Sequence, residues 1–265
     1  MLQIISLRSI ALSGALAASL VLATNTSLAQ TKGTSTSTPV LVELFTAEGC
    51  SSCPPADNLL AQLESQQPVP GADIIVLGEH VDYWDQSGWR DRFDSPQFTE
   101  RQHGYGFRLT VNDIYTPQMI VDGTEQFVGN DTTHALNAIS HAAQAIKVPL
   151  VLAKPEINKH SVIINVSLAS PSTTLPKADL YAALVDPTDT TNVGGGENRG
   201  RTLHHVAVVR VLQRIGKLKN LESGPLKANL STPEGTMPAK MRVVVFAQMP
   251  GPGAVVGAIQ MPVTQ

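Results

Sequence analysis

The two cysteines of the chain, Cys50 and Cys53, lie three positions apart in the stretch LFTAEGCSSCPPAD. Two thiols at this spacing could close a structural disulfide, bind a metal ion, or exchange electrons with other thiols and disulfides. A bridge that closes so short a loop removes little entropy from the unfolded chain and therefore stabilises weakly. A zinc site would need four ligands, usually from a second Cys-x-x-Cys, which the chain lacks. The pair therefore favours redox chemistry.

The residues around the pair predict that it lies where a strand leads into a helix. A β-branched apolar run at residues 40–45 predicts a buried strand, and apolar residues at helical spacing predict a helix at residues 54–66. The unpaired N–H groups of a first helical turn stabilise a nearby thiolate. We therefore expect Cys50, just before the helix, to be the more accessible sulfur and the nucleophile, and Cys53 to be the resolving thiol.

Further elements before residue 148 alternate between strand and helix. A short apolar run predicts a strand at residues 74–77. Ser95-Pro96 predicts a helix start, because serine can cap a helix and proline fits its first turn. Residues 119–128 predict a hairpin, and the alanine-rich residues 131–146 predict a helix.

The pattern changes at residue 148. Strand-like runs follow at residues 162–168, 178–185, 205–212 and 241–248, and a short helix is expected at residues 225–228. We therefore predict two domains, an α/β domain at residues 40–147 and an all-β, sandwich-like domain at residues 148–265.

The start of the chain predicts export. The positive charge of Arg8, a mostly apolar run at residues 10–23 and small residues before residue 30 have the order of a secretory signal peptide, residues 1–29. Residues 30–39 predict a flexible polar tether. No run reaches the ~20 apolar residues that cross a membrane. We expect a periplasmic or secreted protein that is not membrane-spanning.

The net charge of the chain and its expected export limit the classes of partner. The formal net charge is −3, whereas a nucleic-acid-binding domain would present a basic face, so no nucleic-acid partner is expected. Export places both cysteines where disulfides form and persist.

Two separated stretches resemble a thioredoxin-fold domain: residues 41–63, which contain the cysteines, and Tyr115-Thr116-Pro117 with the hairpin that follows. In that fold a cis-proline loop faces the Cys-x-x-Cys, and the backbone of the residue before the proline pairs with substrate. The resemblance therefore implies that Pro117 is cis and that Thr116 binds substrate.

Four motifs, CSSCPPAD, HVDYWDQSGW, YTPQMIVDG and GENRGRTLHH, narrow this resemblance to exported thioredoxin-like proteins of domain-of-unknown-function family 1223. It covers almost the whole chain after the signal peptide. It implies that residues 40–147 form an α/β thioredoxin-like domain with a long aromatic insert, and that the protein has a redox role.

The insert, residues 80–107, contains seven of the twelve aromatic residues, including both tryptophans. Most of these rings are expected to form a small core of their own, because aromatic side chains bury large areas. The alternative is a lid or a partner-binding surface beside the cysteines. Trp84 and Trp89 are the two predicted substrate contacts.

Two residues are candidates for proton relay. Glu43 lies in the first apolar strand, where thioredoxin-like proteins often carry an acidic relay residue. The alternative for Glu43 is a salt bridge to an arginine on the side of the insert. His80 ends the second strand and could tune the Cys50 thiolate, or it could be a structural histidine.

The glycine-rich loop in VGGGENRGRTLHH lacks the pattern of a phosphate-binding loop. We expect it instead to dock the all-β domain on the α/β domain through ion pairs of Glu197, Arg199 and Arg201.

Two main classes of function remain. The first is a thiol–disulfide oxidoreductase that acts on exported protein thiols or disulfides with a redox partner and needs no cofactor beyond the Cys50–Cys53 bridge. The second is a copper-binding or copper-delivery protein with Cys50, Cys53 and His80, or His204 or His205, as ligands, because soft thiolates select Cu(I). A weaker third is an assembly module with an inert bridge.

Overall fold

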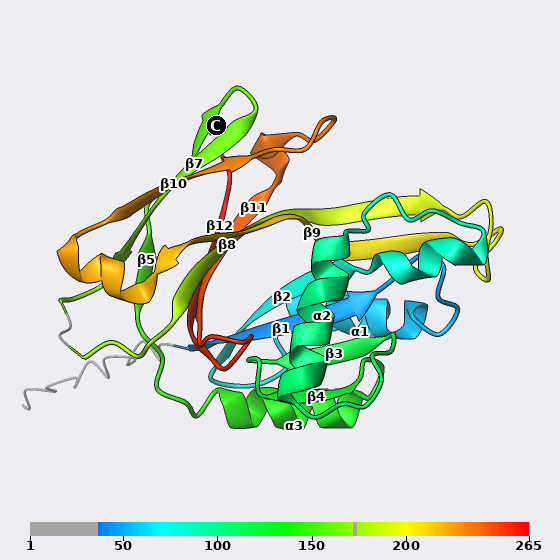
Figure 1. Cartoon of the computed structure of the whole chain (residues 1–265), viewed down its shortest axis with the longest axis horizontal. Coiled ribbons are helices and arrows are strands. Elements are labelled where there is room, and N and C mark those ends of the chain that lie inside the picture. The colour runs from blue at the N-terminus through cyan, green and yellow to red at the C-terminus, as the bar shows by residue number, and fades with distance from the viewer. Residues whose placement is uncertain (1–36, 172–173, 265) are drawn as a thin grey trace, which may run out of the picture. The chain divides into compact units, whose positions relative to one another are not determined.

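An eight-stranded mixed sheet lies at the centre of the protein, with strand order β12-β11-β8-β9-β2-β1-β3-β4 (Figure 1). Its strands are β1 (Thr38–Thr46), β2 (Ala72–His80), β3 (Gln118–Val121), β4 (Glu125–Val128), β8 (Asp179–Asn192), β9 (Thr202–Lys217), β11 (Arg242–Gln248) and β12 (Val255–Pro262). A second sheet contains β5 (Leu150–Leu152), β6 (Glu156–Asn158), β7 (Ser161–Leu168) and β10 (Leu226–Ser231). The computed structural model describes residues 37–171 and 174–264.

Three α-helices accompany the first half of the chain: α1 (Pro54–Gln66), α2 (Pro96–Arg108) and α3 (Thr132–Ala142). On β1, Thr46 contacts α1 while Glu43 contacts α2. Side chains three positions apart on a strand point to opposite faces, so α1 and α2 cover opposite faces of the sheet. This explains why β1 is buried on both faces from residue 40 to residue 46.

Local signals set the starts of α1 and α2 as predicted. Cys53 is the N-cap of α1, and prolines occupy the first turn, where no helical N–H bond is lost. Ser95 caps α2 by accepting a hydrogen bond from the Gln97 backbone N–H (3.2 Å). The predicted hairpin is also present as β3 and β4, and its turn residue Gly123 has a φ of 67°. A Cβ at this glycine would lie 2.2 Å from the Gly253 carbonyl oxygen.

One predicted helix, at residues 225–228, is wrong. These residues enter β10, which pairs with β7 in antiparallel register. Leu226, Ala228 and Leu230 face the protein interior while the residues between them are exposed, which is the two-residue period of a strand. Pro225 suggested a helix start, but the alternation across the following residues decides the structure.

The large sheet crosses the predicted domain boundary at residues 147 and 148. β9 from the second half pairs with β2 from the first, with Val208 opposite Gly78. A Cβ at Gly78 would lie 3.0 Å from the Val206 carbonyl oxygen, so glycine permits this close approach. All described residues belong to one compact unit.

Two apolar cores nevertheless form, one of which draws only on residues after 148 and packs between the two sheets. The other lies under α1 and α2 and takes residues from both halves of the chain. The division into two domains stays a prediction.

The predicted signal peptide, residues 1–29, lies outside the described residues. Most of the predicted tether, residues 30–39, lies outside them too, but its last two residues begin β1, where the Thr38 N–H donates to the Gly71 carbonyl (2.8 Å). The tether prediction is wrong at this end, because polar residues can extend a strand whose backbone finds a partner. Within residues 37–171 and 174–264, no helix is long and apolar enough to cross a membrane.

Candidate functional site

Cys50 and Cys53 form a disulfide with a Cα–Cα separation of 5.4 Å. Cys53 is the N-cap of α1, and Cys50 lies in the preceding turn, where its backbone N–H donates to the Ala47 carbonyl (3.2 Å). The predicted position of the pair, between a buried strand and a helix start, is confirmed.

The predicted accessibility of Cys50 is wrong. Both cysteines have a relative exposure of 0%, although Ser51 and Ser52 between them are exposed. A distant residue covers the turn that contains Cys50: the Asn198 side-chain amide donates to the backbone carbonyls of Glu48 (2.9 Å) and Cys50 (2.8 Å). Sequence reasoning missed this cover because the two segments are 150 residues apart.

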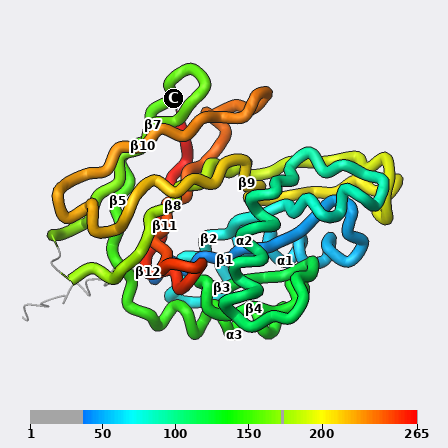
Figure 2. Tube along the Cα trace, in the orientation of Figure 1, coloured from blue at the N-terminus to red at the C-terminus, as the bar shows by residue number. Residues whose placement is uncertain are grey.

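The cover is the tip of the β8–β9 hairpin, residues 193–201, which we call the hairpin tip. It reaches the same end of the molecule as the cysteine turn (Figures 1 and 2). Its Glu197 carboxylate accepts hydrogen bonds from the Ser51 backbone N–H (3.1 Å) and hydroxyl (2.6 Å). Glycine allows the close fit, since a Cβ at Gly195 would lie 2.4 Å from the Gly88 carbonyl oxygen.

The tip therefore binds the cysteine turn, but through different contacts from the predicted ion pairs, and the docking of one domain on another stays a prediction. Glu197 binds a serine, and the uncharged Asn198 makes the central contacts. Arg201 orients Asn198 by donating to its side-chain oxygen (2.9 Å). A loop with so little apolar surface docks through hydrogen bonds to the backbone of the cysteine turn.

The loop around Pro117 is next to the same region. The Thr116–Pro117 peptide bond is cis, as the resemblance implied. An ideal Cβ on Gly129 would lie 3.1 Å from Cβ atoms of both Pro117 and Ala56, which places this loop beside the start of α1.

The two predicted aromatic contacts are both half-buried near the cysteine turn. The Trp84 indole N–H donates to the Thr116 hydroxyl (2.7 Å), and the Trp84 Cβ lies against Gly49, next to Cys50. The Trp89 indole N–H donates to the Glu48 carboxylate (2.7 Å). Trp84 thus joins the cysteine turn to the cis-proline loop.

The other aromatic residues of the insert differ in burial. Phe98 and Tyr105 belong to the core under α2, which corrects the expectation of a separate small core, and Phe107 is 93% exposed.

Beneath the cysteine turn lies a group of buried ionisable side chains that we call the histidine cluster. Its members are Glu48, Asp57, His80, Asp91 and His205. The Nδ1–H of the predicted relay residue His80 donates to the Asp91 carboxylate (2.6 Å), and the ring of His80 lies 4.8 Å from that of His205. No described contact joins His80 to a cysteine.

Two members of this cluster have polar atoms without partners. Neither ring nitrogen of His205, which is 3% exposed, makes a hydrogen bond, and the same holds for Glu48 Oε1. His205 Nε2 and Glu48 Oε1 lie 3.5 Å apart. Unsatisfied buried polar atoms are costly and mark functional sites or unseen water.

Asp57 connects the cluster to the disulfide. It lies one helical turn after Cys53, and its backbone N–H donates to the Cys53 carbonyl (3.1 Å). Its carboxylate accepts a hydrogen bond from the Thr46 hydroxyl (2.9 Å). Sequence reasoning missed Asp57, although an acidic residue on the apolar face of the predicted helix was a usable signal.

The cluster shifts the pKa values of its members. Burial raises the pKa of Asp57, and this effect outweighs the charges of His205 and His80, which act to lower it. Burial would lower the pKa of His80, but the charge and hydrogen bond of Asp91, with Asp57 and Glu48, raise it overall. The pKa of Asp91 is lowered, because His80 and backbone N–H groups outweigh the effect of burial.

The second predicted relay residue, Glu43, lies elsewhere. Its carboxylate accepts from the Arg101 guanidinium (2.6 Å) and the Tyr105 hydroxyl (2.5 Å), under α2 on the face away from α1. The salt bridge weighed as the alternative is therefore present. Glu79 lies 3.6 Å from Arg101, and Gln248 donates to Tyr105 (2.7 Å).

We call this second group of residues the arginine cluster; its members are Glu43, Glu79, Arg101, Tyr105 and Gln248. Burial and the charge of Glu43 hold the pKa of Glu79 well above its ordinary value.

No group of three His, Cys, Asp or Glu side chains could hold a metal ion within the described residues. The copper alternative thus gains no support from the geometry, and it stays a prediction.

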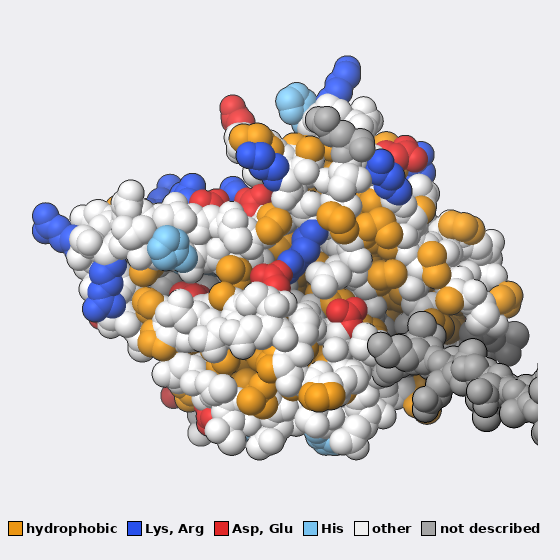
Figure 3. Space-filling view, turned by 180° about the vertical axis from the view of Figure 1, so that it is seen from behind, with side chains coloured by type: hydrophobic (Ala, Val, Ile, Leu, Met, Phe, Trp, Pro, Cys, Tyr) orange, Lys and Arg blue, Asp and Glu red, His pale blue; other side chains and the backbone are white. Residues whose placement is uncertain are grey.

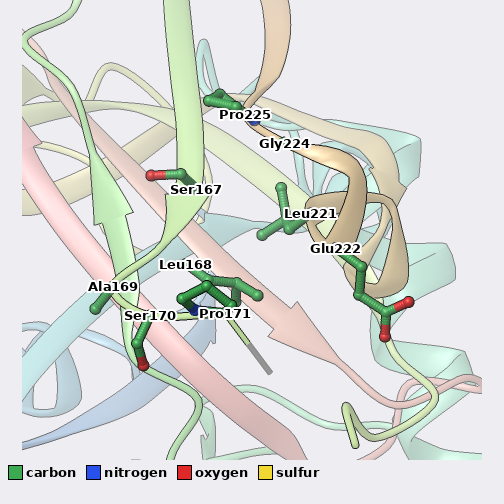
Figure 4. A pocket seen from close by; sticks show the side chains of 9 residues that line it. All are labelled: Ser167, Leu168, Ala169, Ser170, Pro171, Leu221, Glu222, Gly224 and Pro225. Atoms are coloured by element: carbon green, nitrogen blue, oxygen red, sulfur yellow. The ribbon is translucent and has the colours of Figure 1, made fainter. Parts of the chain in front are cut away.

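A hollow of about 460 Å³ is lined by residues distant in sequence from the cysteines, within residues 167–171 and 221–225 (Figure 4). Its one ionisable lining residue is Glu222, so it offers little chemistry. On the face shown in Figure 3, basic and acidic side chains are interspersed.

Comparison with known proteins places the chain in a family. A crystal structure of a protein from Agrobacterium tumefaciens is 29% identical, with a TM-score of 0.64, and the match covers 86% of this chain and 96% of that one. A domain of the outer membrane lipoprotein Omp28 from Porphyromonas gingivalis is 10% identical, with a TM-score of 0.25, over 45% of this chain and 89% of that one. No curated protein matches. The profile described as "Protein of unknown function (DUF1223)" matches residues 41–248, and the chain belongs to this family.

Proposed function

We propose that the protein is an exported thiol–disulfide oxidoreductase and that its first half is a thioredoxin-like domain. One observation carries the proposal: a disulfide across three positions at the start of α1 lies beside a cis-proline loop, to which Trp84 links it. A purely structural bridge gives no reason for this arrangement. The buried ionisable groups under the bridge support the same role.

The proposed chemistry is an exchange of two electrons between dithiols and disulfides. The Cys50 thiolate attacks a substrate disulfide, forms a mixed disulfide and releases one substrate thiolate. The Cys53 thiolate then attacks Cys50 Sγ, restores the bridge and releases the second substrate thiolate. A redox partner must reduce the bridge again, and the reverse sequence oxidises a substrate dithiol.

The cover imposes a condition on this chemistry, because neither sulfur is exposed. The hairpin tip must leave the cysteine turn before a protein substrate can reach Cys50. Four hydrogen bonds from Asn198 and Ser51 hold the tip there. At about 0.5–1.5 kcal/mol net for each, opening costs a few kcal/mol, which local fluctuations supply.

The test is equilibration of the folded protein with glutathione buffers, followed by alkylation of free thiols and mass spectrometry. We expect a potential between about −270 and −120 mV, the range of exchange-active pairs. The Cys53→Ser variant should accumulate mixed disulfides with exported proteins, and Cys50→Ser serves as the matched control that should not. A bridge that resists these buffers would refute the proposal. Tight Cu(I) uptake without exchange would instead favour the copper alternative.

A further inference from the structure

The cysteine turn binds the hairpin tip through a small set of polar groups in residues 48–51. The Ser51 backbone N–H (3.1 Å) and hydroxyl (2.6 Å) both donate to one oxygen of the Glu197 carboxylate. The backbone carbonyls of Glu48 and Cys50 accept from the Asn198 amide. Two donors and two acceptors therefore lie in the stretch that contains Cys50, the proposed nucleophile.

Within the described residues, the tip supplies the only hydrogen-bond partners of two of these groups. The Ser51 N–H and the Glu48 carbonyl make no other described hydrogen bond. The Cys50 carbonyl, by contrast, also accepts from the Cys53 backbone N–H (3.2 Å). When the tip leaves, a donor and an acceptor beside Cys50 lose their partners. An incoming molecule with matching groups restores what opening removes.

The tip shows which chemical groups match. A carboxylate lies where two donors converge, and charge-assisted hydrogen bonds are about twice as strong as neutral ones. The hydroxyl and the N–H of Ser51 lower the pKa of Glu197, so the contact favours the charged form. The next residue, Asn198, presents a carboxamide whose NH2 group has one hydrogen for each carbonyl. Arg201 donates to the oxygen of that amide (2.9 Å), which leaves the NH2 group facing the turn.

We infer that residues 48–51 form a receptor for an acidic residue followed by a carboxamide residue, and that Glu197 and Asn198 fill this receptor as an internal ligand. Preferred protein substrates carry the same pair, an acidic residue followed by asparagine or glutamine, beside the sulfur that Cys50 attacks. This second part rests on the proposed function. Such a substrate replaces the hydrogen bonds of the tip with equivalent ones, whereas a substrate without the pair leaves these groups unpaired. The difference gives specificity.

Binding is tested first, without redox chemistry, on the oxidised protein. An open variant combines Gly195→Ala with Glu197→Ala and Asn198→Ala. A Cβ at Gly195 would lie 2.4 Å from the Gly88 carbonyl oxygen, and the other two changes remove the internal ligand. All three positions lie beyond the paired residues of β8 and β9, so the strands keep their pairing. Faster hydrogen exchange at the Ser51 amide should report that the tip has left.

The probe is an acetylated and amidated peptide with the sequence GGENRG, which is that of residues 195–200. It should shift the Ser51 amide resonance of the open variant. The peptide GGQNRG, which lacks the carboxylate, should bind at least about tenfold more weakly, because a hydrogen bond to a charged group is worth that factor or more. The peptide GGELRG, which lacks the carboxamide, should also bind more weakly than GGENRG.

Two serine variants of the open protein locate the receptor. Ser51→Ala should bring the affinities for GGENRG and GGQNRG closer together, because the hydroxyl that binds the carboxylate is gone. Ser52→Ala is the matched control, because Ser52 is also exposed but its hydroxyl lies 3.4 Å from Cys50 Sγ and makes no described contact with the tip. This control should leave both affinities unchanged.

Substrate preference is measured next, with wild type and a mixture of disulfide peptides randomised on both sides of the cysteine. Peptides with an acidic residue followed by asparagine or glutamine should react about tenfold faster than the average of the mixture. Equal rates across the mixture, together with selective binding of GGENRG, would limit the receptor to the tip and overturn the substrate preference.

The remaining outcomes separate the receptor from the oxidoreductase. If wild type exchanges with glutathione but the open variant binds the three peptides equally or not at all, the receptor is refuted and the oxidoreductase stands. If the tip stays docked in the open variant, Glu197 and Asn198 do not hold it, and the receptor is again refuted. Selective binding without any exchange by wild type overturns the oxidoreductase alone. If the open variant does not fold, as judged by its thermal transition, the variant without the Gly195 change replaces it.

Discussion

The histidine cluster and the arginine cluster lie on opposite faces of the same sheet, and two consecutive residues of β2 show the contrast. His80 points toward the cysteine turn and Glu79 toward α2. Each cluster contains several buried carboxylates. In the arginine cluster, however, the charge of Glu43 is matched by a guanidinium that never loses its proton near neutral pH.

The histidine cluster has no such permanent cation in its described contacts. Its positive charges come from histidines, which gain and lose protons near neutral pH. Both clusters contain buried polar atoms without a hydrogen-bond partner, on His205 and Glu48 in the histidine cluster and on Glu79 and Gln248 in the arginine cluster. A buried carboxylate alone therefore does not distinguish a functional site from a structural ion pair. The type of cation beside the carboxylate is the more informative feature. The predictions below test this contrast.

The largest effect is expected from Arg101→Met. The change removes the cation that the described contacts place against Glu43 and Glu79, which leaves the buried charge of Glu43 without compensation. Breaking one side of a buried ion pair costs about 3–5 kcal/mol, so the free energy of unfolding in urea should fall by that amount. A loss below about 1 kcal/mol would show that the cluster is not held by this charge.

A smaller loss is expected from Asp91→Asn in the histidine cluster. Asp91 accepts hydrogen bonds from the backbone N–H groups of Glu48 (2.8 Å) and Phe93 (2.9 Å) and pairs with His80. Losing the charge should cost about 1.5–3 kcal/mol of unfolding free energy. The loss should be greatest near neutral pH and should shrink in acid, where the wild-type carboxylate is protonated, because the pKa of Asp91 is lowered in the fold.

Asn198→Ala should expose the bridge. The variant loses both hydrogen bonds to the cysteine turn, worth about 1–3 kcal/mol together. Reduction of the bridge by a dithiol should then be about tenfold faster or more, and the thermal transition should fall by about 2–4 °C for each kcal/mol lost. Asn192→Ala, at the start of the same hairpin turn, is the control. Equal rates in wild type and Asn198→Ala would mean that the tip does not limit access.

The pH dependence of stability should differ between the faces. The pKa of His80 is raised from 6.5, so the folded state holds this proton more tightly than the unfolded chain. The resulting stabilisation is fully present below pH 6.5 and is lost as pH rises through the folded-state value. Urea titrations from pH 6 to 9 should show this decline in wild type but not in His80→Gln. A decline of the same size in the variant would show that a group other than His80 causes the loss of stability.

The smallest effect is expected from Glu79→Gln. Burial and the charge of Glu43 hold the pKa of Glu79 well above its ordinary value, which favours the protonated form that an amide resembles. The free energy of unfolding should change by less than about 1 kcal/mol at pH 7. As pH rises, the variant should become more stable relative to wild type. A large loss would mean that the charged form of Glu79 completes the arginine cluster.

Local signals in the sequence predicted the elements that hold the cysteines. The spacing of apolar residues gave the bounds of α1, and Ser95 with the proline after it marked the start of α2. Both depend on contacts within one or two turns, which neighbouring residues determine. The resemblance supplied the cis bond at Pro117, which no local rule would have given.

Long-range contacts were not predictable in the same way. The face of the sheet toward which the Glu43 side chain points depends on strand register, and a register shift of one residue would turn this side chain to the opposite face. The cover by Asn198 and the approach of His205 depend on where β9 docks against β2. Nothing near these residues in the sequence specifies that pairing.

The 150-residue separation between Glu48 and Asn198 has a consequence for maturation. The segment that closes over the cysteine turn is made long after the cysteines themselves, so a growing chain presents both thiols before this segment can dock. An oxidant that meets the chain at this stage can install the bridge early, and docking of β9 then covers a bond that has already formed.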